Sequence, residues 1–339
     1  MTDIPDKPQA AALARSSRFN VLWHAVPWIV AIAFYYTAGG FLSLGTSILV
    51  MILLTLSLDL ALGYAGIITL GHAAFFGFGA YGAALFSLHV NTDPVLGLLV
   101  ATAATAVFAA LTGMLILHTQ GITLLMLTLA ISVLLYEAAN RAYKITGGDD
   151  GLQFEMGPVL GLFRFDLWGK TAYLYALAVL LVWFIVAWRM VQSPFGRSLD
   201  GIRQSPPRMK AIGTPVWWRL VAIYSISAAM AGTAGALSAQ TTRFVGLNTL
   251  GILISGIAVV MLVLGGTRRL YGAFLGAAIY VVVQDYAAKV NPFYWMFVIG
   301  ALLMATVLFL ENGLMGIMDK VGTLARDQLR RVFGQPSQP

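Results

Sequence analysis

The sequence predicts an all-α fold, that of a polytopic α-helical membrane protein with about ten transmembrane segments. Two observations carry this prediction. Of the 339 residues, 59% are hydrophobic and only 10% are charged, and the mean hydropathy is +0.82. Soluble domains are about 25% charged and about 45–50% apolar, so an aqueous core could not bury this much apolar surface. The second observation is that apolar runs long enough to cross a bilayer, roughly 20 residues, recur along the chain.

The candidate spans lie between two terminal segments that we expect outside the lipid. They lie near residues 21–41, 44–61, 63–90, 95–117, 122–140, 173–188, 218–240, 253–264, 271–286 and 293–310. We therefore expect an N-terminal segment over residues 1–20, a transmembrane domain over 21–312 and a C-terminal tail over 313–339. The first apolar run lacks a small-residue cleavage site, which favours a retained span over a signal peptide.

The positions of the basic residues predict the orientation of the chain. With a cytoplasmic N-terminus, ten spans return the C-terminus to the cytoplasm, and six basic residues face outward: Arg141, Lys144, Arg164, Lys170, Arg243 and Lys289. The other fifteen of the 21 lysines and arginines face the cytoplasm, as the positive-inside rule expects. The net charge of +7 thus follows from topology, and no nucleic-acid partner is needed to explain it.

Two polar segments interrupt the spans. Residues 141–172 form an expected external loop that contains "TGGDDGL", and residues 189–216 form an expected cytoplasmic loop. In the second loop, apolar residues recur at helical spacing beside basic ones (Leu199, Ile202, Met209 and Ile212). A short amphipathic helix there could lie on the membrane or dock on a partner protein, and an ordinary basic loop is the alternative.

Two strings imitate nucleotide-binding motifs. "GFGAYG" at residues 77–82 matches the dinucleotide pattern, but that pattern must join a strand to a helix, and here it lies inside an apolar span. "GKT" at residues 169–171 lacks the P-loop glycine five positions earlier, where Arg164 stands. The four histidines show no metal-binding spacing, and cysteine is absent. We expect no catalytic residues, no metal site and no cofactor in this chain.

The glycines of the third span have two open interpretations. Gly77 and Gly79, with Gly63, Gly66, Gly71 and Gly82 nearby, would either let neighbouring helices pack closely or permit a broken or re-entrant helix. In the second case Thr69, His72, Phe75 and Tyr81 would supply side chains to a translocation path. A polar side chain such as that of His72 at membrane depth should face protein or an aqueous path. Both interpretations favour transport over chemistry.

Five stretches, in the same order along the chain, resemble one protein family. "LSLDLALGYAGIITLGHAAFFGFGAYGAAL", "TGGDDGL" and "SPFGRSLDGIRQSPPRMKAIG" resemble signatures of the permease subunits of leucine/isoleucine/valine ABC importers, and so do "SAAMAGTAGAL" and "VLGGTRRLYGAFLGAAI" in the later helices. Urea-transporting permeases are relatives of this family. The length of the chain and its extra N-terminal span resemble the M-type subunit.

The resemblance implies partners as well as a fold. An ABC importer permease pairs with a homologous second permease, two cytoplasmic ATP-binding subunits that hold ATP and Mg²⁺, and a periplasmic solute-binding protein, in the bacterial inner membrane. By this resemblance the cytoplasmic segment would dock on an ATPase subunit through Arg197, Arg203, Pro207, Arg208, Ala211 and Gly213. The same resemblance assigns Gly147, Asp149, Asp150 and Gly151 to the external signature.

Three departures from the family pattern affect the expected substrate and docking. The segment "QSPPRMKAIG" has two prolines and extra positive charge where an acidic stretch is usual, and Asp59 replaces an asparagine. Ile67 takes a position where glutamine is common, which suggests a more apolar substrate such as an aromatic or fatty carboxylate. Branched-chain amino acids are the default expectation. The alternatives are urea or a short amide, and a self-sufficient secondary transporter or channel, which would show inverted repeats.

Overall fold

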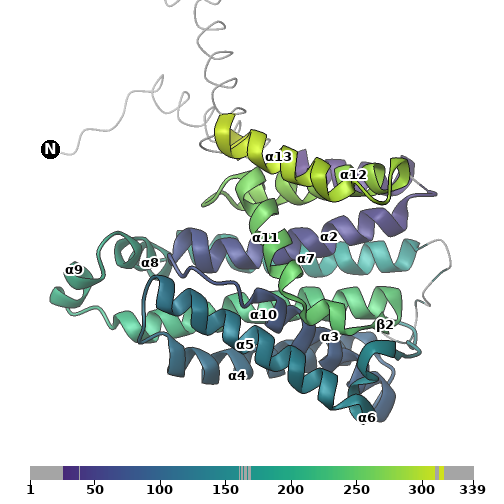
Figure 1. Ribbon diagram of the computed structural model, residues 1–339, viewed down its shortest axis with the longest axis horizontal. Coiled ribbons are helices and arrows are strands. Elements are labelled where there is room, and N and C mark those ends of the chain that lie inside the picture. The colour runs from purple at the N-terminus through teal and green to yellow at the C-terminus, as the bar shows by residue number, and fades with distance from the viewer. Residues whose placement is uncertain are drawn as a thin grey trace, which may run out of the picture.

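The fold is known from a computed structural model that describes residues 26–37, 39–159, 161, 163, 166, 169–309 and 313–316. The predicted N-terminal segment, most of the predicted tail and Arg164 lie outside the described residues. The described residues are mainly helical, as predicted, and they include two short strands (Figure 1).

The elements follow the predicted spans closely. A helix over Val26–Thr37 precedes α2 (Leu42–Leu58), the π-helix η1 (Asp59–Tyr64), α3 (His72–His89), α4 (Pro94–Ile116), α5 (Ile122–Arg141), α6 (Tyr143–Thr146), the 3-10 turn η2 (Gly148–Asp150) and β1 (Leu152–Gln153). The second half contains α7 (Lys170–Gln192), α8 (Pro194–Gln204), α9 (Pro206–Ala211), α10 (Val216–Thr242), β2 (Phe244–Val245), η3 (Leu247–Leu250), α11 (Ile252–Gly265), α12 (Leu270–Val290) and α13 (Trp295–Phe309).

Short polar residues and prolines define where several helices begin. The Asp93 carboxylate accepts a hydrogen bond from the backbone N–H of Val95 at 2.9 Å, and Pro94 is the first residue of α4. In the same way the Ser193 hydroxyl accepts from the N–H of Gly196 at 3.3 Å, and Pro194 begins α8. These caps are local, so the sequence alone could predict these boundaries.

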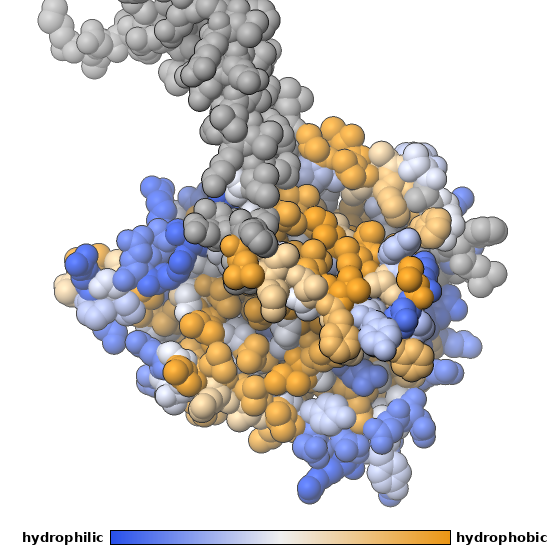
Figure 2. All heavy atoms as spheres, turned by 45° about the horizontal axis from the view of Figure 1, so that its top comes forward, coloured by the Kyte–Doolittle hydropathy of each residue, from blue (hydrophilic) through white to orange (hydrophobic). Residues whose placement is uncertain are grey.

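Six of the described helices are long and apolar enough to cross a membrane. They are Leu42–Tyr64 (α2 with η1), α4, α5, α7, α10 and α12, and three shorter apolar helices are Val26–Thr37, Ile252–Gly265 and Trp295–Thr306. Figure 2 shows hydrophobic residues gathered across the middle of the molecule, with hydrophilic residues toward its ends. The chain is a multi-pass membrane protein, and the total of about ten spans stays a prediction.

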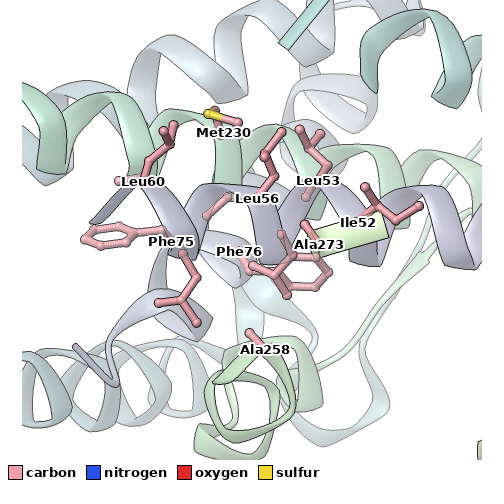
Figure 3. Packing of buried hydrophobic residues seen from close by; sticks show 14 of the residues in the cluster. Ile52, Leu53, Leu56, Leu60, Phe75, Phe76, Met230, Ala258 and Ala273 are labelled. Carbon is pink, nitrogen blue, oxygen red and sulfur yellow. The ribbon is translucent and has the colours of Figure 1, made fainter. Parts of the chain in front are cut away.

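The core forms where α2, α3 and α10 meet. Leu53 and Leu56 of α2, Phe75 and Phe76 of α3, and Met230 of α10 are all buried and belong to one packed cluster (Figure 3). Ala258 of α11 and Ala273 of α12 extend this cluster on its other side. The helices that bury most of their surface are α2 and α10, so they form the centre of the bundle.

The two ends of the bundle carry different polar structures (Figure 1). Helices α8 and α9 project at one end, which we call the α8–α9 end. At the other, the β1–β2 end, β1 pairs with β2 in antiparallel register, Leu152 opposite Val245 and Gln153 opposite Phe244. The sequence did not predict these strands, because each has only two residues and they lie far apart in the chain.

Candidate functional site

The chain leaves the helical conformation between η1 and α3. Residues 65–71 are non-helical, and Gly66 has a φ of +73°, a conformation that favours glycine. The hydroxyl of Thr128 on α5 accepts a hydrogen bond from the backbone N–H of Leu70 at 3.3 Å, and the Thr69 hydroxyl accepts from that of Gly71 at 3.0 Å. Backbone that leaves the helix at membrane depth must find such partners inside the protein. The predicted helix break is confirmed, and it lies before His72.

His72 belongs to a buried hydrogen-bond chain that joins three helices. Its Nε2 lies 3.0 Å from the hydroxyl of Ser227 on α10, and that hydroxyl donates to the backbone oxygen of Ser57 on α2 at 2.6 Å. Because the single hydroxyl proton of Ser227 is used on Ser57, Nε2 must carry the proton and donate to Ser227. Nδ1 of His72 is buried without a hydrogen-bond partner among the described residues.

The residues predicted for a translocation path are packed against protein. Thr69, His72 and Phe75 are each about 1% exposed, and Tyr81 is buried too. Gly77 and Gly79 lie within the continuous helix α3, so "GFGAYG" is not the break itself. A Cβ at Gly77 would overlap Leu250, and one at Gly79 would overlap the backbone of Gly232 on α10. These two glycines permit close helix packing, and the path role of the six residues stays a prediction.

The basic segment forms two helices instead of one. Ser205 is extended and Pro206 begins α9, so the prolines divide the expected amphipathic helix. Leu199 and Ile202 of α8 are about 1% exposed, whereas Ile212 after α9 is 74% exposed and does not join their apolar face. The six residues predicted to dock on an ATPase subunit are all exposed: Arg197, Arg203, Pro207, Arg208, Ala211 and Gly213.

Arg203 ties α8 to the break in the bundle. Its Nη1 donates a hydrogen bond to the backbone oxygen of Gly63 in η1 at 3.0 Å. Its aliphatic stem also lies against Gly66, where a Cβ would come within 2.9 Å of Cγ. A side chain predicted for docking therefore also reaches the helix break, at Gly63 just before it and at Gly66 within it.

A second link joins α8 to the loop between α11 and α12. Asp200 of α8 forms an ion pair with Arg268 in that loop. The backbone N–H of Arg268 donates to the buried carboxylate of Asp59 at 2.8 Å, and its backbone oxygen accepts from the Tyr64 hydroxyl at 3.1 Å. The sequence marked Asp59 only as a departure from the family pattern, and it gave no sign that Asp200 and Arg268 would meet.

The external signature forms a compact turn at the β1–β2 end. Gly147 and Gly151 have φ values of +72° and +70°, and a Cβ at Gly151 would come within 2.6 Å of the backbone oxygen of Val245 in β2. The hydroxyl of Thr146 donates to the backbone oxygen of Ala139 at 2.6 Å, which anchors the turn on α5. Asp149 and Asp150 are exposed. Across the described residues, no three acidic or histidine side chains cluster as metal ligands would.

Comparisons with known proteins agree with this architecture. The family model described as "Branched-chain amino acid transport system / permease component" matches residues 40–307, which run from the start of α2 into α13. The chain belongs to this permease family. The resemblance seen in the sequence is thereby confirmed, and the chain is a transport subunit by family.

Two relatives of the family have been compared along most of their length. The high-affinity branched-chain amino acid transport system permease protein LivM of Salmonella typhimurium is 26% identical over 332 residues, covering 91% of this chain and 76% of the relative. LivM of Escherichia coli is 27% identical over 317 residues, covering 85% of this chain and 73% of the relative. No solved structure matches the chain. Within the permease family, this chain thus resembles the LivM type.

Proposed function

We propose that this chain is the M-type permease subunit of an ATP-driven importer that translocates branched-chain amino acids or related small carboxylates. In this assembly a homologous permease completes the membrane domain, two ATP-binding subunits bind the α8–α9 end, and a periplasmic binding protein delivers solute to the β1–β2 end. The proposed location is the bacterial inner membrane, with both termini in the cytoplasm. ATP and Mg²⁺ belong to the partner subunits.

The observation that carries the proposal is the exposed basic helix pair fixed to the end of the bundle. The apolar side of α8 is buried through Leu199 and Ile202, while the basic residues of α8 and α9 remain exposed. A helix pair that is anchored to the bundle on one side and exposed on the other is suited to transmit a displacement by a partner protein to the bundle. Charged and apolar exposed groups together suit a protein surface better than lipid alone.

The hydrogen bonds of α8 suggest how a displacement of this helix pair would be transmitted. A displacement of α8 would pull on η1 through Arg203 and on the α11–α12 loop through Asp200 and Arg268. The η1 segment is a π-helix, a form that is rare and occurs mostly at functional positions. Motion at α8 would thus reach η1, which also contacts α10, and the loop that leads into α12.

The proposal is tested by reconstitution of the complete transporter in proteoliposomes. We expect uptake of leucine or valine that requires ATP, both ATP-binding subunits and the binding protein. Uptake by this chain without ATPase subunits would instead support a secondary transporter or channel. Uptake of urea or an aromatic acid, with no branched-chain amino acid transported, would overturn the proposed substrate class.

A pair of glycine variants tests the docking role directly. Gly213 and Gly121 both have positive φ (+82° and +63°) and free space around them, but only Gly213 adjoins α9. An arginine at either position is strained by the positive φ, at a cost of about 1–3 kcal/mol. We expect Gly213→Arg to lower uptake per ATP hydrolysed on the order of tenfold, since coupling energies between sites are about 1–3 kcal/mol. Gly121→Arg should leave coupling unchanged, and equal effects of both variants would contradict docking at α9.

A further inference from the structure

A cavity of about 310 Å³ lies between α5 and the segment that connects β2 to α11. Ser132, Val133 and Tyr136 of α5 line one side, and Asn248, Leu250 and Leu253 line the other. Tyr136 is in the C-terminal half of α5 and Asn248 follows β2 closely, so the cavity lies toward the β1–β2 end. Its volume is at the small end of the range of about 300–1,000 Å³ that is common for ligand pockets.

The hydroxyl of Ser132 has no hydrogen-bond partner among the described residues, although the side chain is about 1% exposed. Hydroxyls elsewhere in the helices bond to the carbonyl four residues earlier, as Thr102 does to Leu98 and Thr233 to Ala229. An unpaired buried hydroxyl costs about 1–3 kcal/mol. The lack of this internal bond leaves the Ser132 hydroxyl free to bind a group that enters the cavity.

A second unpartnered hydroxyl lies close by. Tyr81 of α3 is buried, its hydroxyl has no hydrogen-bond partner in the described parts of the chain, and Tyr136 packs against the cluster that contains it. Two buried hydroxyls without partners on one side of the bundle are a costly arrangement unless a solute or water satisfies them. Around the cavity, the polar groups thus outnumber the hydrogen-bond partners that the described residues provide.

The lining defines the chemistry of the occupant. Val133, Leu250 and Leu253 provide apolar walls, Ser132, Tyr136 and Asn248 provide neutral donors and acceptors, and none of the lining residues is charged. An acyl chain would fill the walls but would leave the Ser132 hydroxyl unpaired. A solute with a net charge would lose its hydration without a countercharge, whereas the ammonium and carboxylate of a zwitterion compensate each other in part. A small solute with an aliphatic side chain and no net charge contacts the apolar walls and hydrogen-bonds with the neutral polar groups.

We infer that this cavity is a transient binding subsite for a zwitterionic aliphatic α-amino acid on its way from the β1–β2 end into the membrane domain. The inference rests on the proposed function and deepens it by placing the solute on residues of this chain. The aliphatic side chain lies against Val133, Leu250 and Leu253, and the polar head hydrogen-bonds with Ser132, Tyr136 and Asn248.

A matched pair of substitutions isolates the Ser132 hydroxyl. Ser132→Thr keeps the hydroxyl and Ser132→Val replaces it with a methyl group of the same shape, so the pair differs in hydrogen bonding alone. In the complete reconstituted transporter we expect uptake by the valine variant to fall about three- to tenfold below that of the threonine variant, the effect of one hydrogen bond. If the hydroxyl were only structural, its removal would leave uptake equal in both variants. Equal uptake would overturn the inference.

Photolabelling locates the solute independently. The probe is a diazirine analogue of leucine, delivered by the binding protein in the presence of ATP and mapped by peptide mass spectrometry. We expect labels on residues 132–136 or 248–253 that excess leucine removes. Labels confined to other segments, or labels that leucine does not displace, would overturn the inference and indicate a lipid or a partner side chain in the cavity. A wild-type transporter without ATP-dependent uptake would instead refute the proposed function itself.

Discussion

Two regions of the molecule differ in where their partners lie. One is the contact between α3 and α10, and the other is the α8–α9 segment. Between α3 and α10, glycines allow backbone to touch backbone, as at Gly79 against Gly232 and Gly235 against Phe76, and the buried His72 is bonded to Ser227. In the α8–α9 segment, only the apolar side of α8 is buried, and the predicted docking residues are exposed. In the first region the packing partners belong to this chain, whereas the second region offers a surface for another molecule.

This difference separates stability from coupling. Substitutions in the α3–α10 contact should damage the folded bundle before they affect any partner. Substitutions in the α8–α9 segment should leave the bundle intact and act only when the ATP-binding subunits are present. Three predictions test this separation, in order of decreasing effect on stability.

The largest effect is expected from Gly235→Ala. A methyl group there would overlap the backbone oxygen of Phe76, and backbone cannot move aside as a flexible side chain can. Overpacking of this kind costs about 1–3 kcal/mol or more. We expect a clear loss of thermal stability of the purified subunit in detergent. Gly256→Ala is the matched control, because Gly256 also lies in a helix but has nothing within 4 Å. Alanine should stabilise that helix slightly. Equal melting temperatures would contradict the tight contact.

An intermediate effect is expected from Ser227→Ala. The change removes the acceptor of the His72 N–H and the donor to Ser57, which are both buried. Leaving such groups unpaired costs about 1–3 kcal/mol. Ser225→Ala is the control, since the Ser225 hydroxyl bonds only within its own helix, to the Val221 oxygen at 2.8 Å. Chemical denaturation of both variants should separate them, and a stable Ser227→Ala protein would show that the His72 chain is dispensable.

The smallest effect on stability is expected from the Asp200–Arg268 ion pair. Both side chains are partly exposed, and exposed pairs contribute about 0–1 kcal/mol. Asp200→Arg should therefore change the melting temperature little but should reduce uptake per ATP hydrolysed, because it repels Arg268. Adding Arg268→Asp should restore the pair with reversed charges and recover uptake. Failure of the double variant to recover more than either single variant would mean that the pair does not transmit motion from α8.

Local patterns predicted most of the helices. The expected span over residues 95–117 is observed as α4, and that over 253–264 as α11, because hydropathy and capping residues such as Asp93 act within a few residues. The third span was misplaced at its start. The second helix continues to Tyr64, and α3 begins only at His72, because both sides of the break are equally rich in glycine and apolar residues.

The candidate sites were less predictable, because their geometry depends on distant residues. Asp59 and Arg268 meet across 209 residues of sequence, and no spacing rule connects them. The cavity likewise combines α5 with the segment after β2. Exposure of the basic residues in α8 and α9 could be foreseen from their charge, but the division into two helices required the conformation at Ser205.

By itself the sequence determined that this protein is a helical membrane protein, and its ordered motifs pointed to the permease family. Hydropathy, charge placement and helix caps depend on residues that are close in sequence, so they can be recognised without knowledge of the fold. Only the tertiary structure decided what the glycines of "GFGAYG" do, because a missing side chain has meaning only through the atoms that take its space. It likewise decided that the helix breaks before His72 and that Ser132 faces a cavity unpaired, since both depend on helices that the sequence cannot place beside them.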